Sequence, residues 1–100
     1  MSVDFANYTR TAAVTTEQLI YAGRCVLFGF FCEVVSTGAI TIRNTLLTDG
    51  TGPVVHIAAS GLPINAAKNF GDQRGILLTE GLTIQTAAAT DRCLVKWAPV

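Results

Sequence analysis

Apolar and polar residues alternate along much of this chain, with the period of two that is typical of half-buried β-strands. In the segment 38–45, Ile40 and Ile42 fall on one face, and polar side chains occupy the other. Three further segments alternate in the same way and are also predicted strands: 54–59, 81–86 and 93–97. We therefore expect strands to dominate the structure.

Turn-forming residues separate these segments. The clusters 48–53 and 60–63 each contain Gly and Pro, which supply a positive φ and a fixed φ. A third link, 87–92, contains three alanines but is too short to form a helix alone. The spacing of the turns indicates short strands joined by tight connections.

The first 18 residues are predicted to contain an arm, an edge strand and a turn. The Thr-rich segment 8–15 alternates and is a predicted edge strand. The segment 15–18, Thr-Thr-Glu-Gln, resembles a helix cap, but nothing of helical length follows it, so it is interpreted as a turn. Residues 1–7 are predicted to form an N-terminal arm, in which Val3 and Phe5 are available to dock on a partner.

The segment 24–35 has apolar residues at both its odd and its even positions, so both faces of this predicted strand should be covered. No helices are predicted that would cover a second face, as they do in parallel sheets. One face should enter the core, and the other should meet another chain or a loop. Phe28, Phe30 and Phe31 are the leading interface candidates, and an arm of the same chain wrapped over the strand is the alternative.

Together these features predict an all-β fold, a single-domain antiparallel β-sandwich or jelly roll of about seven to eight short strands. A chain of 100 residues leaves no room for a second core, so the domain is expected to span 1–100. Neither an internal repeat nor a linker is evident.

The composition suggests that a partner covers part of the surface. Half of the residues are hydrophobic and 14% are charged, against about a quarter charged in typical domains. Uncharged polar residues are the alternative covering. Seven basic and seven acidic residues give a net charge of zero with no basic block, so nucleic acid is not an expected partner.

No membrane association is expected either. The longest apolar stretch, 25–32, is far too short to span a bilayer. Residues 1–5 lack the basic region and apolar run of a secretory signal. We expect the chain to be made and kept in the cytoplasm until assembly.

No motif typical of catalysis, metal binding or cofactor binding is present. His56 is the single histidine, and it falls on the less apolar face of its predicted strand, where a structural or surface role is expected. The glycines show no phosphate-binding pattern. Most carboxylates lie in turns, with Glu33 the exception, and an acid pair for glycoside hydrolysis is a minor alternative. We expect no enzyme activity, metal or cofactor.

The cysteines Cys25, Cys32 and Cys93 are odd in number and lack metal-ligand spacing. Without a secretory signal, free buried thiols are expected, and a Cys25–Cys93 disulfide is the alternative. Gly29 inside a strand predicts a bulge or close packing against an aromatic side chain. Trp97 is expected in the core or on the rim of a contact.

The order of elements resembles small structural proteins of tailed bacteriophages that have a β-sandwich or jelly-roll fold. The residues that carry the resemblance are Arg-Cys-Val-Leu-Phe-Gly at 24–29, Ala-Ile-Thr-Ile-Arg-Asn at 39–44, the segment 75–84 and the final strand 93–97. The resemblance covers residues 20–97 through patterns of strand and turn. The chain is similar to capsid decoration (cement) proteins and to related head and tail components.

The resemblance implies a mechanical role. Decoration proteins commonly sit as trimers over capsid three-fold positions and clamp neighbouring major capsid subunits. It thus implies a homotrimer on the capsid surface of the virion, with the major capsid protein as its partner. A head-fibre base, connector or tail subunit is the first alternative, and a carbohydrate-binding jelly-roll module is the second. The three cysteines and the short arm depart from the pattern, which leaves the location on the particle open.

Overall fold

The computed structural model describes residues 6–12, 14–34, 36–64, 66–71 and 74–100. These residues contain nine strands and no helix. The strands are β1 (Asn7–Arg10), β2 (Gln18–Ala22), β3 (Cys25–Cys32), β4 (Ile40–Arg43), β5 (Val54–Ala58), β6 (Ala67–Asn69), β7 (Ile76–Leu78), β8 (Gly81–Thr86) and β9 (Cys93–Pro99). Within the described ranges, no helix is long and apolar enough to cross a membrane.

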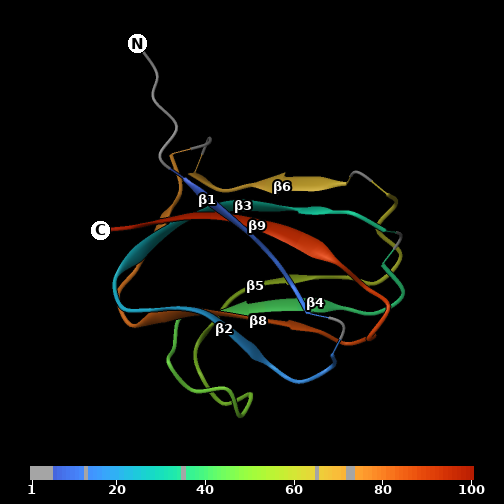
Figure 1. The fold of residues 1–100 in the computed structure, drawn as a ribbon, viewed down its shortest axis with the longest axis horizontal. Helices are drawn as coiled ribbons and strands as arrows, with labels where there is room; N and C mark the ends of the chain where they lie inside the picture. The colour runs from blue at the N-terminus through green and yellow to red at the C-terminus, as the bar shows by residue number, and fades with distance from the viewer. Residues whose placement is uncertain (1–5, 13, 35, 65, 72–73) are drawn as a thin grey trace.

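The strands form two antiparallel sheets that lie one above the other (Figure 1). The five-stranded sheet has the order β1-β9-β3-β6, and β7 pairs with the part of β3 that precedes the β6 pairing. The four-stranded sheet has the order β2-β8-β4-β5. The predicted all-β sandwich is therefore confirmed.

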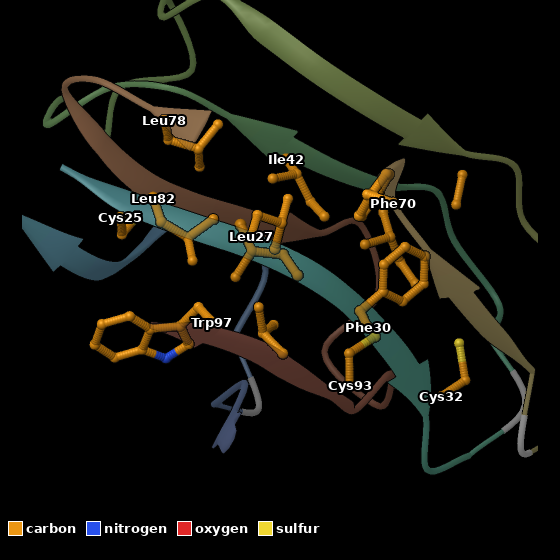
Figure 2. Close-up of a cluster of buried hydrophobic side chains, with 14 residues drawn as sticks. Cys25, Leu27, Phe30, Cys32, Ile42, Phe70, Leu78, Leu82, Cys93 and Trp97 are labelled. Atoms are coloured by element: carbon orange, nitrogen blue, oxygen red, sulfur yellow. The ribbon is translucent and has the colours of Figure 1, made fainter. Parts of the chain in front are cut away.

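The core lies between the sheets, where the apolar side chains of the alternating strands meet (Figure 2). Ile40 and Ile42 of β4 are fully buried, as the alternation predicts, and so are Leu82 and Ile84 of β8. Trp97 of β9 is also a core residue. Burying each such large apolar side chain stabilises the fold by about 1.5–3 kcal/mol.

A β-bulge in β3 decides which of its side chains enter the core. The pairing with β9 shifts register between Leu27 and Gly29. Because the bulge takes up one extra residue, Leu27 and Phe30 are both buried although they are three positions apart. Phe28 and Phe31 are half-buried on the opposite, outer side of the sheet.

Gly29 also allows β3 and β6 to approach closely. It lies opposite Asn69, and a Cβ at this position would collide with the backbone carbonyl oxygen of Lys68. The predicted bulge is thus confirmed. The alternative prediction, close packing against an aromatic side chain, is wrong, because the close neighbour of Gly29 is the backbone of Lys68.

Three local predictions need correction at the start of the chain. The segment interpreted as a turn, 15–18, ends in Gln18, which begins the unpredicted strand β2. This strand forms through long-range pairing with β8, which local turn signals do not reveal. The predicted edge strand 8–15 is shorter than expected, because β1 ends at Arg10. Asn7 belongs to β1 rather than to the expected arm 1–7.

The faces of β5 are the reverse of those predicted. His56 lies opposite the buried Ile42 and packs against Phe70, with ring centroids 5.2 Å apart, whereas Ile57 is 58% exposed. β5 is the edge strand of its sheet, so its inner face lies at the rim, where an imidazole can pack against aromatic rings and still reach solvent.

Candidate interaction face

The outer side of the five-stranded sheet carries apolar side chains from four neighbouring strands. The register places Val26 of β3 opposite Leu77 of β7, and Phe31 of β3 opposite Leu94 of β9. We call this surface the outer face and define it by Tyr8, Val26, Phe28, Phe31, Leu77 and Leu94, together with Lys96.

Exposure differs across the outer face. Leu77 and Tyr8 are 47% and 56% exposed, while the side chains of β3 and β9 are half-buried. A hollow of about 370 Å³ opens beside Gly29. Its walls include Tyr8, Phe31, Ala67, Asn69 and Leu94. The hollow is lined mainly by apolar groups and is open to a partner.

The charged groups that the structure describes on this side include Lys96 and, at the end of the sheet, Arg10 and Glu33. The Lys96 ammonium lies 5.7 Å from the ring centroids of both Tyr8 and Phe28, within the range of a cation–π contact. At the end of the sheet, Arg10 forms a two-pronged ion pair with Glu33, with N–O distances of 2.6 and 2.8 Å. This hydrogen bonding raises the pKa of Arg10 and lowers the pKa of Glu33.

The structure separates the candidate interface residues proposed from sequence. Phe28 and Phe31 reach the outer face, whereas Phe30 is 4% exposed and belongs to the core. Val3 and Phe5 lie outside the described residues. Tyr8, Leu77 and Leu94 were missed, because only the strand register reveals that they flank β3 on the same side.

The outer side of the four-stranded sheet differs in part, because polar groups of the chain itself cover its centre at β8, while Leu19 of β2 and Ile57 of β5 remain exposed at its edges. The Glu17 carboxylate accepts hydrogen bonds from the Thr83 hydroxyl at 2.8 Å, from Arg43 at 3.2 Å and from the backbone N–H of Gly50 at 2.7 Å. The side chains of Glu17 and Arg43 are 1% and 14% exposed. Sequence reasoning placed Glu17 in an ordinary turn and did not find this buried ion pair.

Other carboxylates hold loops, as predicted for Asp residues in turns. Asp91 is 1% exposed and accepts hydrogen bonds from the backbone N–H groups of Thr37 and Gly38. Asp49 bonds to the backbone and hydroxyl of Thr51, and these bonds lower the pKa of Asp49. These groups fix connections between strands.

His56 belongs to an aromatic cluster at the rim of the sandwich. Its ring lies 5.2 Å from that of Phe70 and 6.1 Å from that of Phe30, and a second hollow, of about 260 Å³, lies beside it. Burial, and then the charge of Lys68, lower the pKa of His56. Among the residues that the structure describes, no group of three His, Cys, Asp or Glu side chains is placed to hold a metal.

All three cysteines are buried and free. Cys25 lies opposite Pro99 and Cys93 lies opposite Cys32, so the ends of β9 keep Cys25 and Cys93 apart. The separation of six residues along a strand amounts to about 20 Å. A Cys25–Cys93 disulfide is therefore incompatible with this fold.

Comparison with known protein families, with curated proteins and with solved structures found no match to this chain.

Proposed function

We propose that this protein is a virion structural protein of the capsid decoration type. It binds the major capsid protein shell as a homotrimer and stabilises the shell on the outside of the particle. The observation that carries this proposal is the apolar outer face, whose side chains come from neighbouring strands of one sheet and border an open hollow.

The energetics favour a covered outer face. Each square ångström of apolar surface removed from water contributes about 25 cal/mol, and exposed apolar patches mark interaction sites more often than random surface. The Lys96 ammonium at the centre of the face already packs against the rings of Tyr8 and Phe28, which offsets part of the cost of its desolvation. A rigid sheet also presents these side chains with little loss of conformational entropy on binding.

A shell that is built from many identical subunits is a suitable partner for such a face. One module must engage several identical sites, so the same apolar contacts serve each copy in a closed symmetric arrangement. Binding adds stability to the assembled shell by mass action, because the module binds the shell and not the unfolded subunits. The low content of charged residues is consistent with a surface that is shared between subunits.

Sedimentation measurements on three variants test the use of the outer face. Phe31→Ser and Leu77→Ser remove apolar contacts from this face, and we expect each to weaken self-association at micromolar concentration by at least tenfold. Ile57→Ser is the matched control, because Ile57 is 58% exposed on the other sheet and should leave association unchanged. A wild-type monomer that also fails to bind shells would contradict the proposal.

Binding to a capsid shell tests the partner. The gene adjacent to this one is expected to encode a major capsid protein, and shells assembled from that protein should bind the wild type and the Ile57→Ser control alike. Phe31→Ser should bind at least tenfold more weakly. Equal binding by all variants would show that another surface makes the contact.

One observation favours a second candidate, a carbohydrate-binding module. The hollow beside Gly29 is bordered by the rings of Tyr8 and Phe31 and by the amide of Asn69, which is the kind of surface that sugars stack on and hydrogen-bond to. A glycan array distinguishes the candidates: a specific signal that Tyr8→Ala abolishes would support carbohydrate binding.

A further inference from the structure

The pairing of β3 with β9 brings two cysteines directly together. Cys32 ends β3, Cys93 begins β9, and the two residues lie opposite each other in the ladder. Each is 1% exposed. Figure 2 shows both side chains at the end of the core where Phe30 lies.

The backbone hydrogen bonds define what kind of pair this is. The Cys32 N–H donates to the carbonyl of Ala66 at 2.8 Å, on the side away from β9. The backbone of Cys93 bonds to Thr11, on the side away from β3. The Cys93 N–H donates to the Thr11 hydroxyl at 3.1 Å, and the Cys93 carbonyl accepts from the Thr11 N–H at 2.9 Å. Cys32 and Cys93 therefore form a non-hydrogen-bonded pair.

This geometry suits a disulfide. In a non-hydrogen-bonded antiparallel pair the Cα atoms are about 4.5 Å apart and the side chains are at their closest. Disulfides require a Cα separation of about 4.4–6.8 Å. Both side chains also lie on the core side of the sheet, so forming the bond needs little movement of the backbone.

We propose that Cys32 and Cys93 are a disulfide-forming site whose oxidant is a low-molecular-weight disulfide such as glutathione disulfide. One thiol loses its proton to water and attacks the glutathione disulfide, which releases one glutathione. The second thiol then loses its proton and attacks the mixed disulfide, which releases the other. Two protein thiols are oxidised to one disulfide, and one glutathione disulfide is reduced to two thiols.

Burial makes this site latent in the folded protein. Burial raises the pKa of the Cys32 thiol. Burial and the neighbouring Cys32 thiol together raise the pKa of Cys93 to about 12. Because the thiolate is the attacking species, the native pair reacts slowly. The disulfide between Cys32 and Cys93 forms fast only while the chain folds or while this end of the sheet opens. The proposal does not depend on the function proposed above.

Once closed, the disulfide links the two central strands of the five-stranded sheet. It encloses roughly 60 residues of chain, so it restricts the unfolded state strongly. We expect the melting temperature to rise by about 10 °C in the oxidised protein. The sheet that carries the outer face would then be stabilised whenever the protein meets an oxidising medium.

Refolding the reduced full-length chain with glutathione disulfide tests the proposal. Alkylation after denaturation without reductant should modify one thiol, Cys25, and mass spectrometry should find a peptide that joins Cys32 to Cys93. The variant Cys25→Ala should retain no modifiable thiol. Native protein incubated with the same oxidant should reach the same product more slowly, which gives a second measurement independent of refolding.

Cys93→Ala serves as the matched variant that removes the pair but keeps Cys25. After the same treatment it should form no intramolecular disulfide, and its melting temperature should not depend on the oxidant. Three modifiable thiols in the oxidised wild type, a stable glutathione adduct in place of the bond, or a disulfide that includes Cys25 would overturn the proposal.

Discussion

β3 and β8 are both central strands, but the chain treats their outer sides differently. The outer side of β8 includes Thr83, which is fully buried because Glu17 lies over it and accepts its hydroxyl proton in a hydrogen bond. The outer side of β3 carries Phe28 and Phe31, which remain half-buried. The polar outer side of β8 is thus covered from within at Thr83, whereas the apolar outer side of β3 is only partly covered by the described residues.

This contrast has an energetic reason. A polar group is buried at little cost only when it finds enough hydrogen-bond partners, and Glu17 finds its partners in segments that are distant along the chain. Apolar side chains need contact area but no particular partner. They are therefore the surface that a separate protein can cover without leaving unpaired groups.

The strongest test of the contrast compares two adjacent residues of β3. Phe30→Ala should lower the free energy of unfolding by about 3–5 kcal/mol, because it leaves a cavity in the core. Phe31→Ala should lower it by about 1 kcal/mol or less, since its side chain is already in contact with solvent. Urea unfolding followed by circular dichroism measures both, and equal losses would show that both faces of β3 are covered within one chain.

The next largest effect is expected at the covered strand. Glu17→Ala removes the partner of the buried Arg43, whose Nε already has no hydrogen-bond partner among the described residues. We expect a loss of about 2–4 kcal/mol, below the full penalty for a buried charge because Arg43 retains some exposure. The measurement is again urea unfolding.

Glu33→Ala is the matched control for Glu17→Ala, because it breaks an exposed ion pair with Arg10. Exposed pairs contribute little, so its loss should be clearly the smaller of the two. If the two variants were equally stable, the polar cover over β8 would not be a source of stability, and the contrast between the two sheets would fail.

Gly29→Ala sharpens the contrast on the side of β3. The added Cβ would meet the carbonyl oxygen of Lys68, so β6 must move away or the bulge must change. We expect a loss of about 1–3 kcal/mol in thermal unfolding, which is typical of overpacking. Gly61→Ala is not a suitable control, because Gly61 has a positive φ of 89°. Ala67→Gly, on the neighbouring strand, tests instead whether any change of side chain beside the hollow has this effect.

The smallest effect is a pH dependence at the rim of the four-stranded sheet. Burial lowers the pKa of His56 from its ordinary value of 6.5, so the unfolded chain binds this proton more readily than the folded chain. The stabilisation that depends on the uncharged His56 ring is therefore fully present above pH 6.5, and it is lost as the pH falls through the lowered pKa. Between pH 7 and about 5 we expect the melting temperature to fall by about 1–2 °C, because the ring is partly solvated.

His56→Gln should remove this dependence. Glu33 loses its stabilising charge only in a lower pH range, because the pKa of Glu33 lies below its ordinary value of 4.5. A pH profile of His56→Gln that matches the wild type between pH 7 and 5 would show that His56 is not the group responsible.

The sequence by itself predicted most of the longer strands and the buried side of β4, but it did not reveal β2, β6 or β7, and it gave the wrong inner face for β5. The alternation around Ile40 and Ile42 is a local property, so it survives without knowledge of the fold, and the apolar run of β3 indicated a strand that needs cover on two sides. The low content of charged residues predicted a surface shared with a partner, and this stays a prediction. These conclusions depend only on neighbours along the chain.

Only the tertiary structure decided which side chains share a face and which residues meet across strands. The bulge at Gly29 sent Phe30 inward and Phe31 outward, the rim position of β5 turned His56 toward Phe70, and pairing with β9 placed Cys32 beside Cys93. Each outcome depends on strand register, and a shift of one residue reverses every face. Register is set by contacts between residues far apart in the chain, and therefore a local pattern cannot supply it.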